Sequence, residues 1–412
     1  MSRQMIRTGA SWRPKRARKS LRLARTAAPG ILLAGLISGA AAQDMRELLD
    51  RLPAGTLTEA RGFDALAGWP AANHAGSFAV FQQTCLAAQT APRPGVPLPA
   101  SLALICRQAA RLGALEPDNA RRFFEAHFQP VEIMPGGGPG FMTGYYEPEV
   151  PGALTESPEF STPLLARPDD LAAISKGTGV DAETSAGRRL PDGSIVPYPD
   201  RAAIGGGALG RFARPLVFVR DEVEAFFIHV QGSARVRLAD GQVKRLSFAG
   251  RNGHAYTSIG RVIADEGHMR IEEMNLASIK AWLRADLARG RAILQRNRSY
   301  IFFAESPSLL PEMGPIGGAG VPLTPWISIA VDNGIWPYGL PIWIEAGLPE
   351  PGGALNAFHA LTIAADTGTA IKGPARIDLF HGWGEAAGEL AGLVRHSMRF
   401  FALLPNRAGT VP

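Results

Sequence analysis

Two carboxylates lie twelve positions apart between residues 365 and 382, at Asp366 and Asp378. Glycines and short apolar runs surround both, a composition suited to close backbone approach and to buried strands. Asp378 lies within the run Ile377-Asp378-Leu379-Phe380, where an isolated anion would be costly. Its carboxyl group must therefore be paired, hydrogen-bonded or kept partly protonated. Either aspartate alone has a structural interpretation, such as capping a turn, but the pair in this setting favours a chemical site.

A third aspartate, Asp332, stands at the end of another apolar run. The segment Ser328–Val331 is typical of a strand, Asp332-Asn333-Gly334 is typical of a turn, and Leu340–Glu345 predicts a second strand. For Asp332 the role of a turn former is at least as well supported as a catalytic one.

The three aspartate segments resemble the three-aspartate domain of the membrane-bound lytic murein transglycosylase A family, in which the last two aspartates bracket a Gly-Ala-Ile-Lys-Gly motif. Further segments resemble family motifs in the same order, and they are Thr143–Pro148, Phe227–Ser233, Ala249–Gly260 and Asn297–Phe303. Together the segments span roughly residues 141 to 400. The chain departs from the pattern at Thr367 and Thr369, which flank Gly368 where many relatives carry a second glycine.

The resemblance implies a mainly β fold with helices (α+β), in which a six-stranded double-psi β-barrel carries a second, inserted β domain and a substrate groove lies between them. Periodicity alone indicates only an α+β protein. The expected divisions are an export signal at 1–42, a helical N-terminal part joining the barrel at 43–140, an inserted β-rich domain at 141–312, the three-aspartate part of the barrel at 313–405, and a tail at 406–412.

The resemblance also implies a reaction. A lyase of the lytic exotransglycosylase type cleaves the MurNAc-GlcNAc β-1,4 bond of peptidoglycan without water, because the muramic acid 6-hydroxyl attacks its own anomeric carbon. Asp378 would donate a proton to the glycosidic oxygen, then accept one from that hydroxyl, leaving a 1,6-anhydromuramic acid end. Burial can raise a carboxyl pKa to about 6, which suits such an acid. Asp366 would orient the sugar, and Asp332 would support the barrel.

Matching motif positions imply a set of substrate-binding residues, which are Thr143, Tyr145, Gln231, Asn252, Tyr256, Gly368 and Lys372. A packing role for the two tyrosines and a turn-closing role for Gln231 and Asn252 are about as well supported. Two roles are open for Lys372: it could bind a muramyl carboxylate or form an ion pair with Glu385.

Two other functions remain open at this stage. One is a polysaccharide hydrolase on a related double-psi barrel, with Asp378 as acid and Asp366 as base; the other is a non-catalytic peptidoglycan-binding scaffold. No cofactor is expected. Zinc catalysis has little support because His229, His254, His381 and His396 do not form a close ligand cluster, and a metal site built from the three aspartates has little support as well.

The N-terminal segment predicts an exported protein. Nine of the 43 Lys and Arg residues lie in residues 1–42, which hold no acid, so the basic pI predicts no nucleic-acid partner. That basic start precedes a short apolar run, Ala27–Gly39, and small residues ending at Ala42, a pattern typical of a cleaved export signal. No cysteine follows that site to carry a lipid. We therefore expect a soluble periplasmic monomer acting on glycan strands, and leave open peripheral association with the outer membrane or a cell-wall complex.

The remaining pattern predicts the elements around the site. Helices are expected in the segments Arg46–Leu49, Phe78–Ala88, Ser101–Leu112, Asn119–Phe124 and, as one long helix, Leu276–Gln295. Strands are expected at Leu216–Val219 and Ala225–Val230, and a hairpin turn at Asp240-Gly241. Cys85 and Cys106 fall in two of the expected helices, where a disulfide and two free buried thiols are nearly equally supported.

Overall fold

The computed structural model describes residues 39–91, 93–174, 186–349 and 355–406 of the 412-residue chain. Residues 1–38 of the expected export signal and residues 407–412 of the expected tail lie outside the described residues. Within those described ranges, no helix combines the length and the apolar character that crossing a membrane requires.

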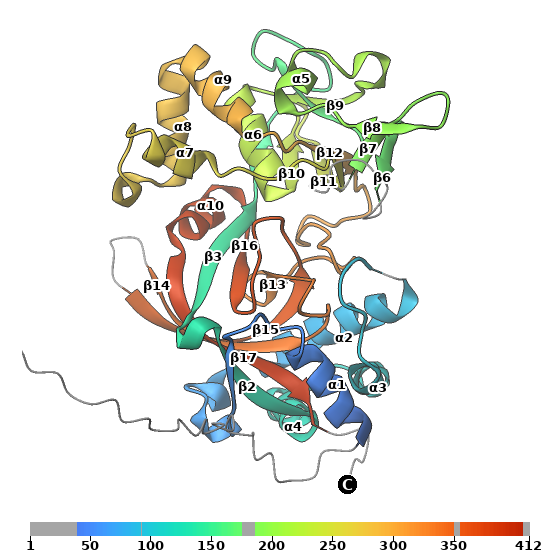
Figure 1. Ribbon diagram of the computed structural model, residues 1–412, viewed down its shortest axis with the longest axis vertical. Coiled ribbons are helices and arrows are strands. Elements are labelled where there is room, and N and C mark those ends of the chain that lie inside the picture. The colour runs from blue at the N-terminus through green and yellow to red at the C-terminus, as the bar shows by residue number, and fades with distance from the viewer. Residues whose placement is uncertain (1–38, 92, 175–185, 350–354, 407–412) are drawn as a thin grey trace, which may run out of the picture. The chain divides into compact units, whose positions relative to one another are not determined.

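Strand β3 and five strands from the last part of the described chain close into a barrel (Figure 1). The pairing order is β17–β14–β15–β13–β16–β3, and β3 pairs back to β17, so these six strands of the described chain form a closed ring. Their bounds are β3 Gly140–Glu147, β13 Ser328–Val331, β14 Pro341–Pro349, β15 Leu355–Asp366, β16 Arg376–Trp383 and β17 Arg395–Pro405. The expected six-stranded barrel is confirmed, and two of its pairings, β13 with β15 and β16 with β3, are parallel.

Alternation along the strands decides which side chains fill the barrel. Ile377 and Leu379 of β16 and Ile329 of β13 are fully buried in the main hydrophobic cluster. Because successive residues of a strand point to opposite faces, Asp378, which lies between the first two, faces away from that cluster.

N-terminal elements extend and cover the barrel sheet. Strand β2 (Phe128–Met134) pairs with β17, and β1 (Leu57–Ala60) pairs with β2. The helices of this region are α1 Gly39–Leu49, α2 His74–Thr90, α3 Ala100–Ala109 and α4 Pro117–His127, so the expected helices are all present. Aromatic rings from α2 and α4, such as Phe78 and Phe123, meet edge to face at 4.9 Å between centroids and join these helices to the main core.

The segment between β3 and β13 forms separate sheets. A four-stranded sheet has the order β12-β11-β10-β4, a second sheet pairs β5 with β9, and a third has the order β6-β7-β8. The strands are β4 Glu149–Pro151, β5 Thr162–Leu165, β6 Leu171–Ala173, β7 Ala186–Arg189, β8 Ile195–Pro197, β9 Pro215–Val219, β10 Ser233–Arg237, β11 Val243–Arg251 and β12 Ile301–Glu305. The inserted domain is expected to begin at residue 141, and strand β3, which spans that position, pairs with the barrel strands β16 and β17.

Helices accompany these sheets, and they are α5 Arg201–Gly205, α6 Glu222–Gln231, α7 Ile259–Asp265, α8 Leu276–Ala285 and α9 Leu287–Arg296. The strand expected at Ala225–Val230 is wrong, because these residues lie in α6. Asp221 caps its first turn by accepting a hydrogen bond from the Glu224 N–H, and Gly232 ends it at a φ of 86°. A continuous apolar run is compatible with a buried strand and with a buried helix, and here both ends of α6 are capped as in a helix.

The single long helix expected at Leu276–Gln295 is also wrong, because the chain breaks at Asp286. Asp286 adopts extended backbone angles and accepts a hydrogen bond from the Arg289 N–H, so it ends α8 and caps α9. By contrast, the strand at Leu216–Val219 and the hairpin at Asp240-Gly241 are confirmed, with Gly241 at a φ of 85°.

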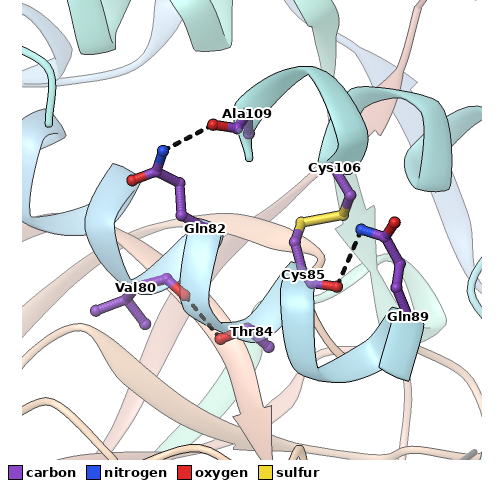
Figure 2. The surroundings of a disulfide bond; sticks show 7 residues. All are labelled: Val80, Gln82, Thr84, Cys85, Gln89, Cys106 and Ala109. Carbon is purple, nitrogen blue, oxygen red and sulfur yellow. Dashed lines mark hydrogen bonds between the residues drawn. A yellow bond between two sulfur atoms is a disulfide. The ribbon is translucent and has the colours of Figure 1, made fainter. Parts of the chain in front are cut away.

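A disulfide joins Cys85 of α2 to Cys106 of α3, as Figure 2 shows, and this resolves the alternatives left open by the sequence. Both cysteines are fully buried, and the bond closes a separation of 21 residues. A loop of this size predicts a stabilisation of about 3 kcal/mol, chiefly through a more restricted unfolded chain.

We therefore expect dithiothreitol to lower the midpoint of thermal unfolding. A Cys85→Ala/Cys106→Ala variant should show no response to dithiothreitol, and an equal response in both proteins would contradict this assignment.

Candidate active site

Strand register brings two of the three aspartates to one face of the sheet. Ala330 of β13 pairs with Asp378 of β16 on one side and with Asp366 of β15 on the other. With strands about 4.8 Å apart, the two aspartate Cα atoms are about 10 Å apart, and the side chain between them is a single methyl group. Asp366 and Asp378, twelve residues apart in the sequence, thus lie on opposite sides of strand β13 in the same sheet.

Asp378 is held by a chain of hydrogen bonds from the neighbouring strand. The Thr143 hydroxyl donates to Asp378 Oδ1 at 2.6 Å, and Arg376 Nη2 donates to Thr143 Oγ1 at 2.9 Å. Register explains both contacts, because β3 and β16 run parallel with Thr143 opposite Asp378. In the described part of the chain, Oδ2 of Asp378 receives no hydrogen bond.

The electrostatic setting of Asp378 suits a proton donor. Burial raises the pKa of its carboxyl group to about 6, although the hydrogen bond from Thr143 and the charge of Arg376 pull that pKa down and the Asp366 carboxylate raises it. The side chain remains partly exposed, so a ligand can reach it. A carboxyl group with this pKa is substantially protonated at mildly acidic pH.

Asp366 differs because both of its oxygens are engaged. Tyr145 donates its hydroxyl to Oδ2 at 2.9 Å, and the Gly318 N–H donates to Oδ1 at 2.7 Å. Burial raises the pKa of this carboxyl group, and the bonds from Gly318, Thr367 and Tyr145 oppose that rise. The arrangement orients Asp366 and leaves it less available for proton transfer than Asp378.

Asp332 closes the turn after β13 and is buried, with 8% of its surface exposed. Its Oδ1 accepts hydrogen bonds from Lys372 Nζ at 3.0 Å and from the Gly334 N–H at 3.1 Å, and its Oδ2 accepts one from the Gly373 N–H at 3.0 Å. Lys372 therefore pairs with Asp332 and not with Glu385. These contacts tie the turn to the loop before β16, which is a supporting role.

The remaining residues expected to touch substrate divide into two groups. Asn252 is fully buried. Its side-chain amide donates to the carbonyls of Pro199 and Arg298, and its Oδ1 accepts a hydrogen bond from the Tyr300 N–H, so it holds loops together. Gln231 accepts a hydrogen bond from the Tyr146 N–H, which joins α6 to β3.

Tyr256 and Gly368 have different links to the aspartates. Burial raises the pKa of the Tyr256 hydroxyl and the Asp378 carboxylate adds to that rise, so the two groups share one electrostatic environment. Gly368 follows Asp366 by two residues, and its carbonyl accepts a hydrogen bond from the Ile371 N–H at 3.0 Å.

Two contributors to the site were not expected from the sequence. Arg376 is in the same strand as Asp378 and two residues earlier, a spacing that puts both on one face and would have predicted it. Gly318 supplies its N–H to Asp366, and a Cβ there would lie 2.4 Å from the Tyr338 hydroxyl. A glycine in a loop gives no such signal.

Among the described residues, no group of three or more His, Cys, Asp or Glu side chains is arranged to hold a metal ion. The donors around each aspartate are hydroxyl, amide, guanidinium and ammonium groups, which satisfy a carboxylate directly.

Comparison with known proteins gives matches in both parts of the fold. Residues 141–304 match a family model described as the MltA specific insert domain, and residues 327–404 match one described as the 3D domain. A membrane-bound lytic murein transglycosylase A from Vibrio cholerae is 38% identical over 210 residues, which is 50% of this chain and 55% of that protein. The chain thus spans about half the length of that curated relative.

Solved structures match over more of the chain. The crystal structure of a membrane-bound lytic murein transglycosylase from Agrobacterium tumefaciens is 35% identical with a TM-score of 0.76, and the match covers 84% of this chain and 97% of that one. A structure of Escherichia coli MltA with bound chitohexaose is 28% identical with a TM-score of 0.60, and the match covers 83% of this chain and 91% of that one.

Proposed function

We propose, from the premise that this chain belongs to the membrane-bound lytic murein transglycosylase A family, that it cleaves the MurNAc-GlcNAc β-1,4 bond of peptidoglycan without water. One observation carries the proposal. Asp378 keeps one oxygen free of hydrogen bonds from the described residues and has a pKa of about 6, whereas both oxygens of Asp366 are engaged.

In the first step, protonated Asp378 gives its proton to the glycosidic oxygen, and the bond from that oxygen to the anomeric carbon of the muramyl residue breaks. The Thr143 hydroxyl fixes Oδ1 and so directs Oδ2 to the substrate. Once the proton has left, the carboxylate is stabilised by the same hydroxyl and by the charge of Arg376.

In the second step, the carboxylate of Asp378 accepts the proton of the muramyl 6-hydroxyl as that oxygen bonds to the anomeric carbon. The product ends in 1,6-anhydromuramic acid, and Asp378 is protonated again for the next cycle. One carboxyl group suffices because the acid of the first step becomes the base of the second.

The geometry gives less support to the hydrolase alternative. A hydrolase of this type needs a second carboxylate free to activate water or to attack the sugar. Asp366, the only candidate beside Asp378 on this face of the described sheet, accepts hydrogen bonds from Tyr145 and Gly318. We infer that Asp366 orients a sugar hydroxyl through this network, with Tyr145 and Tyr256 near the cleaved bond.

The organisation follows from the same proposal. We infer that residues 141–312 act as the inserted domain, that glycan strands bind between it and the barrel, and that the exported protein works in the periplasm as a monomer.

Digestion of purified sacculi tests the function directly. The purified protein should release muropeptides with anhydro ends, detected by mass spectrometry. Reducing ends alone would refute the proposal in favour of the hydrolase, and undigested sacculi would favour the non-catalytic scaffold.

The pH dependence should follow the Asp378 carboxyl group. Because the first step needs the protonated form, kcat/KM should fall as the pH rises past about 6. The Thr143 hydroxyl stabilises the carboxylate and so lowers this pKa, and Thr143→Val should therefore move the fall in kcat/KM to higher pH. Profiles of kcat/KM against pH check this, and a shift to lower pH would contradict it.

A further inference from the structure

The face that carries Asp378 continues across β3 to β17. Thr143 pairs with Asp378 on one side and with Arg395 on the other, and in the next outward row Phe141 pairs with Arg376 on one side and with Ser397 on the other. Directly paired residues point to the same side of a sheet. Arg395 and Phe141 therefore lie on the face of Thr143 and Asp378, on the side of Asp378 away from Asp366.

Two arginines on this face form no ion pair among the described residues, although the charge of Arg376 acts on the nearby Asp378 carboxyl group. Arg376 donates to Thr143, and Arg395 donates from Nη2 to the Met274 carbonyl at 2.8 Å. Neither forms an ion pair with a carboxylate in the ranges that the structure describes. Arg399, further along β17, shows the contrast, because it pairs with Glu132 at 2.9 Å and with Glu345 at 2.8 Å.

An exposed aromatic ring lies between the two arginines. Phe141 is 44% exposed, which is unusual for a phenylalanine in a barrel strand, and the Arg376 guanidinium lies 5.3 Å from its ring centroid. Arg395 is exposed as well. The surface beside Asp378 thus combines an apolar platform with two positive charges, which matches a sugar ring that carries a carboxylate.

We propose that Arg395, Arg376 and Phe141 form a subsite for a carboxylate-bearing muramyl residue next to the cleaved bond. The subsite rests on the proposed function, since it names the substituent that the same groove selects. Two sources share this chemistry: the lactyl carboxylate of a peptide-free muramyl residue, and the carboxylates of a stem peptide.

Binding measured without turnover tests the subsite. In the Asp378→Asn protein, which does not consume its ligand, isothermal titration would compare neutral chitohexaose, peptide-free murein strands and peptide-bearing murein strands. Adding Arg395→Gln should weaken binding of at least one carboxylate-bearing ligand about fivefold, because a partly exposed charge-assisted hydrogen bond is lost. Chitohexaose binding should stay within about twofold. The ligand that loses affinity identifies the source of the carboxylate.

Two further variants separate recognition from folding. Arg395→Lys keeps the charge and should recover part of the lost affinity, and Arg111→Gln makes the same charge change at an exposed arginine after α3 and should change no affinity. An equal loss for chitohexaose, or no loss for either carboxylate-bearing ligand, would overturn the subsite. Reducing ends in the sacculus digest would refute the proposed reaction while leaving this binding result intact.

Discussion

Replacing Asp378 with Asn will reduce the release of anhydro-muropeptides at least about a thousandfold, because one side chain supplies both the acid and the base of the reaction. Asparagine keeps the shape and accepts the Thr143 hydrogen bond, but it has no proton to give to the glycosidic oxygen. The measurement is muropeptide release from sacculi, followed by mass spectrometry. Clearing of sacculi at a rate near that of the unchanged protein would exclude Asp378 as the catalytic residue.

Stability measurements distinguish this loss from misfolding. The pKa of Asp378 is about 6 in the folded protein and 3.8 as the ordinary value, so its contribution to folding is fully present below pH 3.8 and is lost as the pH rises through 6. The Asp378→Asn protein lacks this loss. It should therefore unfold at a higher temperature than the unchanged protein at pH 7.5, and the difference should shrink towards pH 4.

Asp366→Asn, which alters the orienting aspartate, should reduce muropeptide release less than Asp378→Asn does.

The largest effect on stability is expected at Glu147, in a buried cluster of three charges. Arg235 Nε donates to Glu147 Oε2 at 2.7 Å, Arg245 Nη2 donates to the same oxygen at 3.0 Å, and all three side chains are buried. Glu147→Gln would leave two buried guanidinium groups with no anion, which should lower the free energy of unfolding by about 3–5 kcal/mol. Chemical denaturation at neutral pH measures this change.

A matched control uses the same substitution in an exposed pair. Lys244 and Glu305 lie 3.1 Å apart on neighbouring strands β11 and β12, and both side chains are about a third exposed. Glu305→Gln should change the free energy of unfolding by less than about 1 kcal/mol. If Glu147→Gln lowered the free energy of unfolding by no more than this control, the buried cluster would not contribute to stability as we expect.

The cluster also joins the two halves of the fold. Glu147 ends barrel strand β3, while Arg235 and Arg245 come from the inserted sheet. Both arginines donate to the Met313 carbonyl, in the segment through which the chain returns to the barrel. One set of contacts thus holds both places where the chain passes between the barrel and the inserted sheets.

Local pattern predicted the strands that carry the aspartates, because Ile377, Leu379 and Phe380 are typical of a buried strand and Asp332-Asn333-Gly334 of a turn. It also indicated the raised pKa of Asp378, since burial follows from those neighbours. The resemblance to a family supplied what local pattern lacks, which is the closed barrel. The pairing of Thr143 with a strand more than two hundred residues later was not predicted.

Other features depended on tertiary contacts or on a single cap. The run Ala225–Val230 is apolar enough for a strand, and the caps of α6, Asp221 and Gly232, lie outside that run. Asp286 looks like one more polar residue on a helix surface, yet its backbone breaks the chain into α8 and α9. Arg395 donates to the Met274 carbonyl and forms no ion pair among the described residues, which its position in the sequence does not reveal.

The ring of strands has a consequence for biosynthesis. Strand β3 is complete at residue 147, but both of its neighbours, β16 and β17, lie within the last forty residues of the described chain. A nascent polypeptide therefore carries an unpaired edge at β3 until β16 and β17 have been made, more than two hundred residues later, and contacts of such long sequence separation form slowly. An edge left open for so long invites aggregation, so deleting β17 should yield insoluble protein instead of a weaker enzyme.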